Sequence, residues 1–132
     1  MTTSYALATA QTAPMPTAID ETHLGRMTLG DRRLEREVLE LFLRQTAIML
    51  DRIVGAEPPL AAAAAHTLKG SARGIGAWRV AHAAEILETA AGSTEARDLE
   101  GALAELKAAS LEAGAAIAAR LTALFAELGG SR

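Results

Sequence analysis

The feature that most constrains the fold of this chain is the spacing of its apolar residues. From residue 31 to residue 128 they recur mostly at every third or fourth position, which places them along one face of an α-helix. No segment alternates apolar and polar residues as a half-buried strand would. Alanine and leucine, both strong helix formers, supply most of the apolar content. The chain is therefore predicted to be all-α, and its 132 residues fit one domain.

Glycine and proline residues divide this pattern into five predicted helices. Asp31 is a suitable N-cap for the second helix, and Ser93 or Thr94 for the last. Pro58 or Pro59 suits the first turn of the third helix, which should end between residues 73 and 76. The predicted helices cover residues 19–27, 32–54, 58–76, 77–91 and 95–128.

The connections between the predicted helices are short, which favours antiparallel neighbours. We therefore expect an antiparallel up-down four-helix bundle with a short extra N-terminal helix, occupying residues 19–132. Residues 1–18 are rich in threonine and alanine and contain two prolines, so we expect a flexible tail. The apolar faces of the helices should all be buried inside the bundle, so we expect a monomer.

The two longest predicted helices each carry an apolar stripe that should face the core. In the helix after Asp31, charged residues such as Glu35 fall mostly on other faces. Its stripe consists of Leu34, Val38, Leu41, Phe42, Ile48, Met49 and Ile53. The stripe of the last helix consists of Leu99, Leu103, Leu106, Ala113, Ile117, Leu121, Leu124, Phe125 and Leu128.

Charge and composition exclude several classes of function. The net charge of −3 argues against a nucleic-acid binder, and the absence of cysteine excludes thiolate chemistry. No apolar run reaches the roughly 18 residues of a membrane span, and the N-terminus lacks a secretion signal, so we expect a soluble cytoplasmic protein without membrane contact. Without a Walker-type nucleotide loop or an aspartate cluster for Mg²⁺, the chain should have no autonomous kinase activity.

One segment of the third helix carries a candidate reactive side chain, His66. A helix turns about 100° per residue, so His66 and Leu68 point in nearly opposite directions. Leu68 shares its face with other apolar residues and should point into the core. This core face comprises Ala61, Ala64, Leu68, Ala72 and Ile75. The opposite, outward face comprises Ala62, Ala63, His66, Lys69, Gly70 and Arg73.

The residues around His66 are unusually small for an exposed helix face. Gly70 is notable, because glycine inside a helix costs about 0.5–1 kcal/mol relative to alanine. It could leave room for a partner to approach the backbone. It could equally permit close packing of a neighbouring helix, or begin the helix end.

Lys69 and the acids of the next helix could support a reactive histidine. Neutral imidazole is a good nucleophile near pH 7, because its ordinary pKa is about 6.5. A phosphoryl group on it would add about two negative charges, which Lys69, three positions away, could offset. A carboxylate that accepts the other ring N–H would hold the reactive tautomer. Both Glu85 and Glu88 are candidates, and each could also be an ordinary solvated acid.

Residues 65–77 closely resemble the signature of histidine-containing phosphotransfer (HPt) domains. That signature has His, Leu two positions later, Lys at three, Gly at four, a small residue at five and Gly at ten. It is matched here in turn by His66, Leu68, Lys69, Gly70, Ser71 and Gly76. The resemblance covers about residues 19–128, and Gly74, an additional glycine, departs from it near the helix end. It favours Glu88 as the residue that orients the histidine.

The resemblance implies a four-helix bundle that relays phosphoryl groups in bacterial two-component systems. His66 would accept a phosphoryl group from the aspartate of one receiver domain, in a hybrid histidine kinase, and pass it to the receiver of a response regulator. The chain would be a phosphocarrier without a cofactor of its own, and the receiver would supply Mg²⁺. We expect the receiver to dock on Ala62, Ala63, Gly70 and Arg73.

Two other functions remain open from the sequence. A non-catalytic adaptor would keep the fold and bind receiver or kinase domains without transfer. A metal-binding bundle would need acids and histidines from several helices, and only His82 and Glu85 form such a pair, in reverse order. We expect no metal site. His23, which has no supporting neighbours in sequence, and His82 are both expected to be surface or structural residues.

Overall fold

The structure is a computed structural model that describes residues 17–129 of the chain. These residues form five helices and no strand, so the all-α prediction is confirmed. The predicted tail, residues 1–18, lies almost entirely outside the described residues. The helices are α2 (Glu21–Met27), α3 (Arg32–Ile53), α4 (Pro58–Ile75), α5 (Trp78–Ala90) and α6 (Ala96–Glu127).

Local sequence signals account for most of the helix ends. The carboxylate of Asp31 accepts hydrogen bonds from two backbone N–H groups of the first turn of α3, and Pro58 occupies the first position of α4. Gly76 ends α4 in the left-handed conformation, with φ of 82°. The predicted cap of the last helix is wrong: Glu95 is the N-cap of α6 and makes no side-chain capping bond. The Ser93 hydroxyl accepts a hydrogen bond from the Glu95 amide instead.

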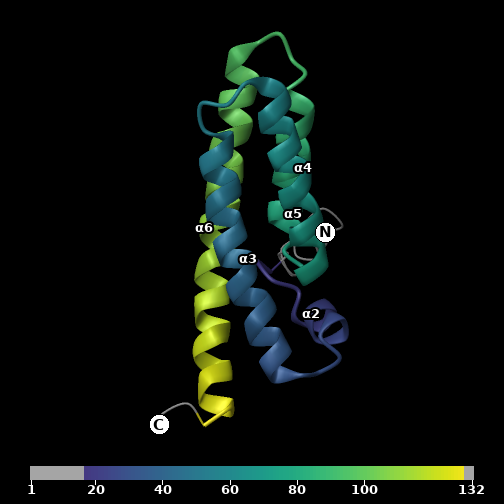
Figure 1. Cartoon of the computed structure of the whole chain (residues 1–132), viewed down its shortest axis with the longest axis vertical. Coiled ribbons are helices and arrows are strands. Elements are labelled where there is room, and N and C mark those ends of the chain that lie inside the picture. The colour runs from purple at the N-terminus through teal and green to yellow at the C-terminus, as the bar shows by residue number, and fades with distance from the viewer. Residues whose placement is uncertain (1–16, 130–132) are drawn as a thin grey trace, which may run out of the picture.

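Helices α3, α4, α5 and α6 lie side by side, and consecutive helices run in opposite directions (Figure 1). Helix α4 contacts α3 and α5, while α6 contacts the same two helices from the other side. The lower parts of α3 and α6 extend beyond the ends of α4 and α5 (Figure 1). The largest fully buried apolar side chains between the helices are Leu39, Leu68, Leu87, Leu106, Ile117 and Leu124.

The core face predicted for α4 is confirmed, whereas the face predicted for α3 is partly wrong. All five predicted core residues of α4 are buried. In α3 the stripe is rotated: Leu34, Leu41 and Ile48 are exposed. Two apolar rows overlap on α3, and the spacing of apolar residues could not decide between them. The row that faces the core comprises Glu35, Leu39, Phe42, Thr46, Met49 and Ile53.

Glu35 is buried because it has charged partners on two helices. Its carboxylate accepts a hydrogen bond from Arg120 Nε of α6 at 2.5 Å and one from Arg32 Nη1 at 3.1 Å. Burial raises the pKa of the Glu35 carboxyl, but the hydrogen bonds and charges of Arg120 and Arg32 outweigh it and lower the pKa below its ordinary value. Glu35 therefore stays ionised and ties α3 to α6.

Helix α6 is long and apolar enough to cross a membrane by length and composition alone, the one such helix among residues 17–129. The prediction from uninterrupted apolar runs missed this segment. Of its most apolar 18-residue window 22% is buried, and α6 contributes Leu106, Ile117 and Leu124 to the core. Phe125, predicted as a core residue, is 54% exposed.

The short helix α2 is attached where α4 turns into α5. The Asp20 amide donates to the carbonyl of Gly76 at 2.9 Å, and the Asp20 carboxylate accepts from Trp78 Nε1 at 2.9 Å. His23 Nε2 lies 3.0 Å from the Arg73 carbonyl, so this nitrogen must donate. His23 is thus a structural residue, as expected, and its neighbours, Arg73 of α4 and Trp78 of α5, come from other helices.

Candidate functional site

Helix α4 places His66 on the surface while its opposite face enters the core. The His66 side chain is 67% exposed, and Leu68 is fully buried. Ala63 and Gly70 are exposed beside the histidine, and Ala62 is half-buried. The outward face therefore presents an imidazole in a collar of small residues.

Glu88 on α5 contacts both His66 and Lys69. One carboxylate oxygen, Oε2, lies 2.9 Å from Nδ1 of His66. The other oxygen, Oε1, accepts a hydrogen bond from Lys69 Nζ at 2.8 Å. The second candidate from the sequence, Glu85, instead lies 3.8 Å from Nη2 of Arg73. The structure thus brings together His66, Lys69 and Glu88 and leaves Glu85 outside this cluster.

The ionisation of Glu88 determines which nitrogen of His66 is protonated. The hydrogen bond from Lys69 lowers the pKa of the Glu88 carboxyl; partial burial raises it, and the bond from His66 lowers it further, with a net shift below the ordinary value. An ionised carboxylate can only accept, so Nδ1 of His66 must donate. In the neutral ring, Nε2 then has a free lone pair on an exposed side chain.

The Lys69 side chain is more buried than its position in the sequence indicates. Its side chain is only 14% exposed, and its ammonium group is paired with Glu88. The face prediction placed Lys69 outward beside the histidine, but α5 covers this edge of α4. Lys69 consequently acts on His66 through the shared carboxylate. Helical spacing within α4 could not reveal this, because the connecting residue is on another helix.

The environment of Gly70 decides between the two explanations for this glycine. A Cβ atom at residue 70 would have no neighbour within 4 Å beyond its own helix, among the described residues. Helix α4 also continues for five more residues, to Ile75. Gly70 is therefore required neither by packing against a neighbouring helix nor by the helix end.

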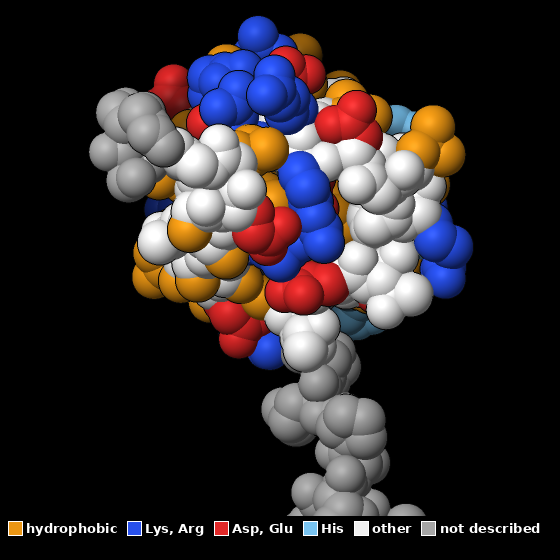
Figure 2. Space-filling model, turned by 90° about the horizontal axis from the view of Figure 1, so that it is seen from below, with side chains coloured by type: hydrophobic (Ala, Val, Ile, Leu, Met, Phe, Trp, Pro, Cys, Tyr) orange, Lys and Arg blue, Asp and Glu red, His pale blue; other side chains and the backbone are white. Residues whose placement is uncertain are grey.

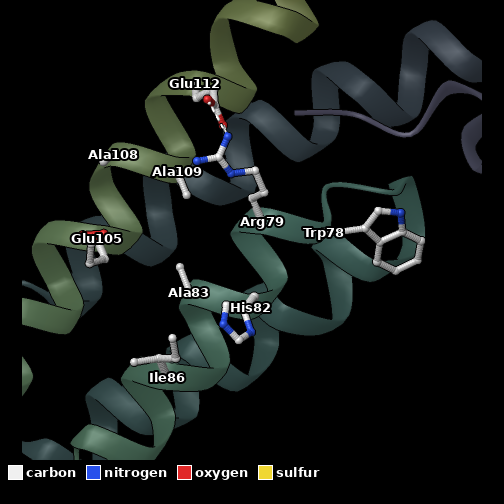
Figure 3. Close-up of a pocket in the computed structure, with 9 residues that line it drawn as sticks. All are labelled: Trp78, Arg79, His82, Ala83, Ile86, Glu105, Ala108, Ala109 and Glu112. Atoms are coloured by element: carbon white, nitrogen blue, oxygen red, sulfur yellow. Dashed lines mark hydrogen bonds and ion pairs between the residues drawn. The ribbon is translucent and has the colours of Figure 1, made fainter. Parts of the chain in front are cut away.

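Two grooves of the molecule do not include the chemical groups of the site. One, between α3 and α4, includes Leu60, Ala63 and Thr67 beside the histidine. The other lies between α5 and α6 and contains His82 and the ion pair of Arg79 with Glu112 (Figure 3). No cluster of three or more histidine, aspartate or glutamate side chains that could hold a metal ion occurs within residues 17–129.

Comparisons with known proteins show the family to which the chain belongs. The family model of the Hpt domain matches residues 37–129. Among solved structures, a rice protein described as a histidine-containing phosphotransfer protein superposes with a TM-score of 0.73 at 17% identity, over 93% of this chain and 89% of that chain. At this level of identity the likeness shows a common fold. No match is found among curated proteins. Because the family model covers well over half of its length, this chain belongs to the Hpt domain family.

Proposed function

We propose that this protein carries a phosphoryl group on Nε2 of His66 and transfers it between aspartates of receiver domains. The observation that carries the proposal is the exposed imidazole whose Nδ1 is held by the carboxylate of Glu88 at 2.9 Å. That contact leaves Nε2 as the nucleophile. We further propose that α3 to α6 act as an antiparallel up-down four-helix bundle that displays this side chain.

The transfer step follows from the protonation state of the ring. The lone pair of Nε2 attacks the phosphorus of an aspartyl phosphate, forming the N–P bond. The bond between phosphorus and the aspartate oxygen breaks, and the aspartate leaves as a carboxylate. Nε2 carries no proton to lose, and the positive charge that develops on the ring is offset by Glu88 through the Nδ1 hydrogen bond. The reverse step returns the phosphoryl group to a second receiver.

Lys69 supports this chemistry by keeping Glu88 ionised. Without the ammonium group, the carboxylate would lose the strongest of the contacts that lower its pKa. A protonated Glu88 could no longer fix the tautomer of His66. Lys69 is therefore proposed as a positioning residue, with Glu88 in direct contact with the reactive ring.

The proposed docking surface is the small-residue collar of α4. Ala62, Ala63 and Gly70 leave space around His66, and Arg73 offers a positive charge at its edge. The partners would be receiver domains of a hybrid histidine kinase and of a response regulator in the cytoplasm. The receiver would also supply Mg²⁺. A small surface of this kind fits the weak, transient association typical of signalling encounters.

A transfer assay tests the proposal. The protein is mixed with a phosphorylated receiver, and acid-labile phosphate on this chain is measured. We expect His66→Gln to abolish the label and His82→Gln, at an exposed histidine of α5, to leave it unchanged. NMR of the phosphorylated protein should place the phosphorus on Nε2. If the wild type binds the receiver but takes no label, the protein is a non-catalytic adaptor. Label that persists in His66→Gln places the reaction elsewhere.

A further inference from the structure

A small pocket lies at the lower end of the molecule, between the beginning of α3 and the end of α6. It is lined by Arg33, Arg36, Phe125 and Leu128 and has a volume of 190 Å³. Figure 2 views the molecule from this end and shows Lys and Arg side chains gathered beside hydrophobic ones. Arg33 and Arg36 precede residue 37, where the match to the Hpt family begins.

Arg36, one of the residues that line this pocket, has an unsatisfied polar atom. Its Nε is buried and has no hydrogen-bond partner among residues 17–129. Leaving a charged buried donor without a partner is unfavourable, and such a group in a folded protein calls for an explanation such as a bound ion.

Three acids near the pocket are engaged elsewhere. Glu35 is bound by Arg120 and Arg32, and the remaining contact of Arg32 is with Glu127 at 3.1 Å. Asp31 accepts from the backbone amides of α3. Within the described part of the chain, neither of the pocket arginines forms an ion pair. Their charges therefore remain available to a ligand.

The apolar side of the pocket also lacks a partner. Phe125 belongs to the apolar stripe of α6 by its spacing, yet it is 54% exposed, and Leu128 lies beside it. Arginine pairs with phosphate through two parallel N–H bonds. Arg33 and Arg36 are three positions apart, on adjacent parts of one helix face. Two guanidinium groups that line one pocket with an aromatic ring can therefore bind a dianion that carries an apolar body.

We propose that this pocket binds a phosphomonoester whose organic part is apolar, with Arg33 and Arg36 on the phosphate and Phe125 and Leu128 on the organic part. The site is separate from His66. The separation can be followed along α3. Gln45 of α3 accepts a hydrogen bond from Ser71 of α4, the helix that carries His66. Arg36 precedes Gln45 by nine residues, about 14 Å along the helix.

An NMR titration of the full chain tests the site with phenyl phosphate, inorganic phosphate and sodium chloride at equal ionic strength. We expect saturable shifts of the Arg33 and Arg36 Nε–H signals and of the Phe125 and Leu128 signals. Phenyl phosphate should saturate at roughly tenfold lower concentration than inorganic phosphate, because the ring is buried on Phe125 and Leu128. Equal saturation by the two phosphates would overturn the apolar part of the assignment.

Charge-removing variants provide the controls. Arg36→Gln should abolish the saturable shifts. If this variant proves poorly folded, Arg33→Gln, which should weaken the shifts, serves as the second test. Arg44→Gln, at an exposed arginine of the same helix, should bind as the wild type does. Shifts that sodium chloride reproduces, or that survive in both pocket variants, would refute the site. Because the titration does not depend on phosphotransfer, its outcome is independent of the role proposed for His66.

Discussion

The carboxylate of Glu88 lies 2.9 Å from Nδ1 of His66, across the interface between α5 and α4. This contact fixes the protonated nitrogen of the ring and leaves the lone pair on Nε2 of a side chain that is 67% exposed. The orientation of the proposed phosphoryl acceptor thus depends on a residue 22 positions later in the chain.

Replacing Glu88 with glutamine should slow phosphotransfer. The amide is neutral and can present its NH₂ group to Nδ1, so the reactive tautomer is no longer enforced. We expect the rate of label transfer from a phosphorylated receiver to fall by roughly tenfold or more. Glu100→Gln, at an exposed position of α6, should transfer at the wild-type rate. Equal rates for both variants would remove Glu88 from the mechanism.

Replacing Lys69 with methionine should raise the pKa of Glu88, because the Lys69 hydrogen bond is the main contact that lowers it. A lowered pKa keeps the carboxylate ionised as the pH falls, so the contact with His66 is present above the folded pKa and lost below it. The Lys69→Met variant should therefore lose the contact between Glu88 and His66 at a higher pH than the wild type does. A carboxyl ¹³C NMR titration measures this, with Lys107→Met as the control. An unshifted Glu88 titration would contradict the assignment.

Gly70→Ala should stabilise the protein and yet impair its docking. A methyl group at residue 70 meets no atom within 4 Å, and alanine favours the helix by about 0.5–1 kcal/mol. Gly101→Ala in α6 is the matched control, since residue 101 is also helical with open space around Cβ. Urea denaturation should show similar gains for both variants, while receiver binding weakens only at residue 70. A larger side chain, as in Gly70→Gln, should increase this difference.

Gly76→Ala should detach α2. Residue 76 has φ of 82°, and a Cβ there would lie 3.0 Å from both the Cβ and the carbonyl oxygen of Asp20. Gly55→Ala isolates the backbone strain, about 1–2 kcal/mol, because Gly55 has φ of 75° but open space. We expect a larger loss at residue 76 and a shift of the Trp78 indole N–H signal, since that group donates to Asp20. Equal losses and an unchanged indole signal would show that α2 tolerates the methyl group.

Glu35→Gln should weaken the attachment of α3 to α6 by about 1–3 kcal/mol in the free energy of unfolding. Glu37→Gln, at an exposed position of the same helix, should have little effect. The Glu35 carboxyl has a lowered pKa in the folded protein, so its stabilising effect is present above the ordinary glutamate pKa and is lost as the pH falls through the folded pKa. The stability difference between wild type and Glu35→Gln should therefore shrink in acid. Urea denaturation over a range of pH measures it.

The sequence by itself determined the helical class, most helix ends and the identity of the exposed histidine. These depend on local physics: apolar spacing predicts a helix, proline and glycine limit it, and the turn of 100° per residue separates His66 from Leu68. The core face of α4 followed from the same geometry, because Leu68 and Ile75 share one face of the helix, opposite His66.

Only the tertiary structure decided which row of α3 is buried, where Lys69 points and what holds His23. Each depends on a side chain from a distant part of the chain. Glu35 is buried because Arg120 meets it from α6, Lys69 is covered because Glu88 approaches from α5, and Gly70 remains open because no helix packs there. Spacing along one helix contains no information about such contacts. The fold therefore completed a site around His66, whose position the sequence had already indicated.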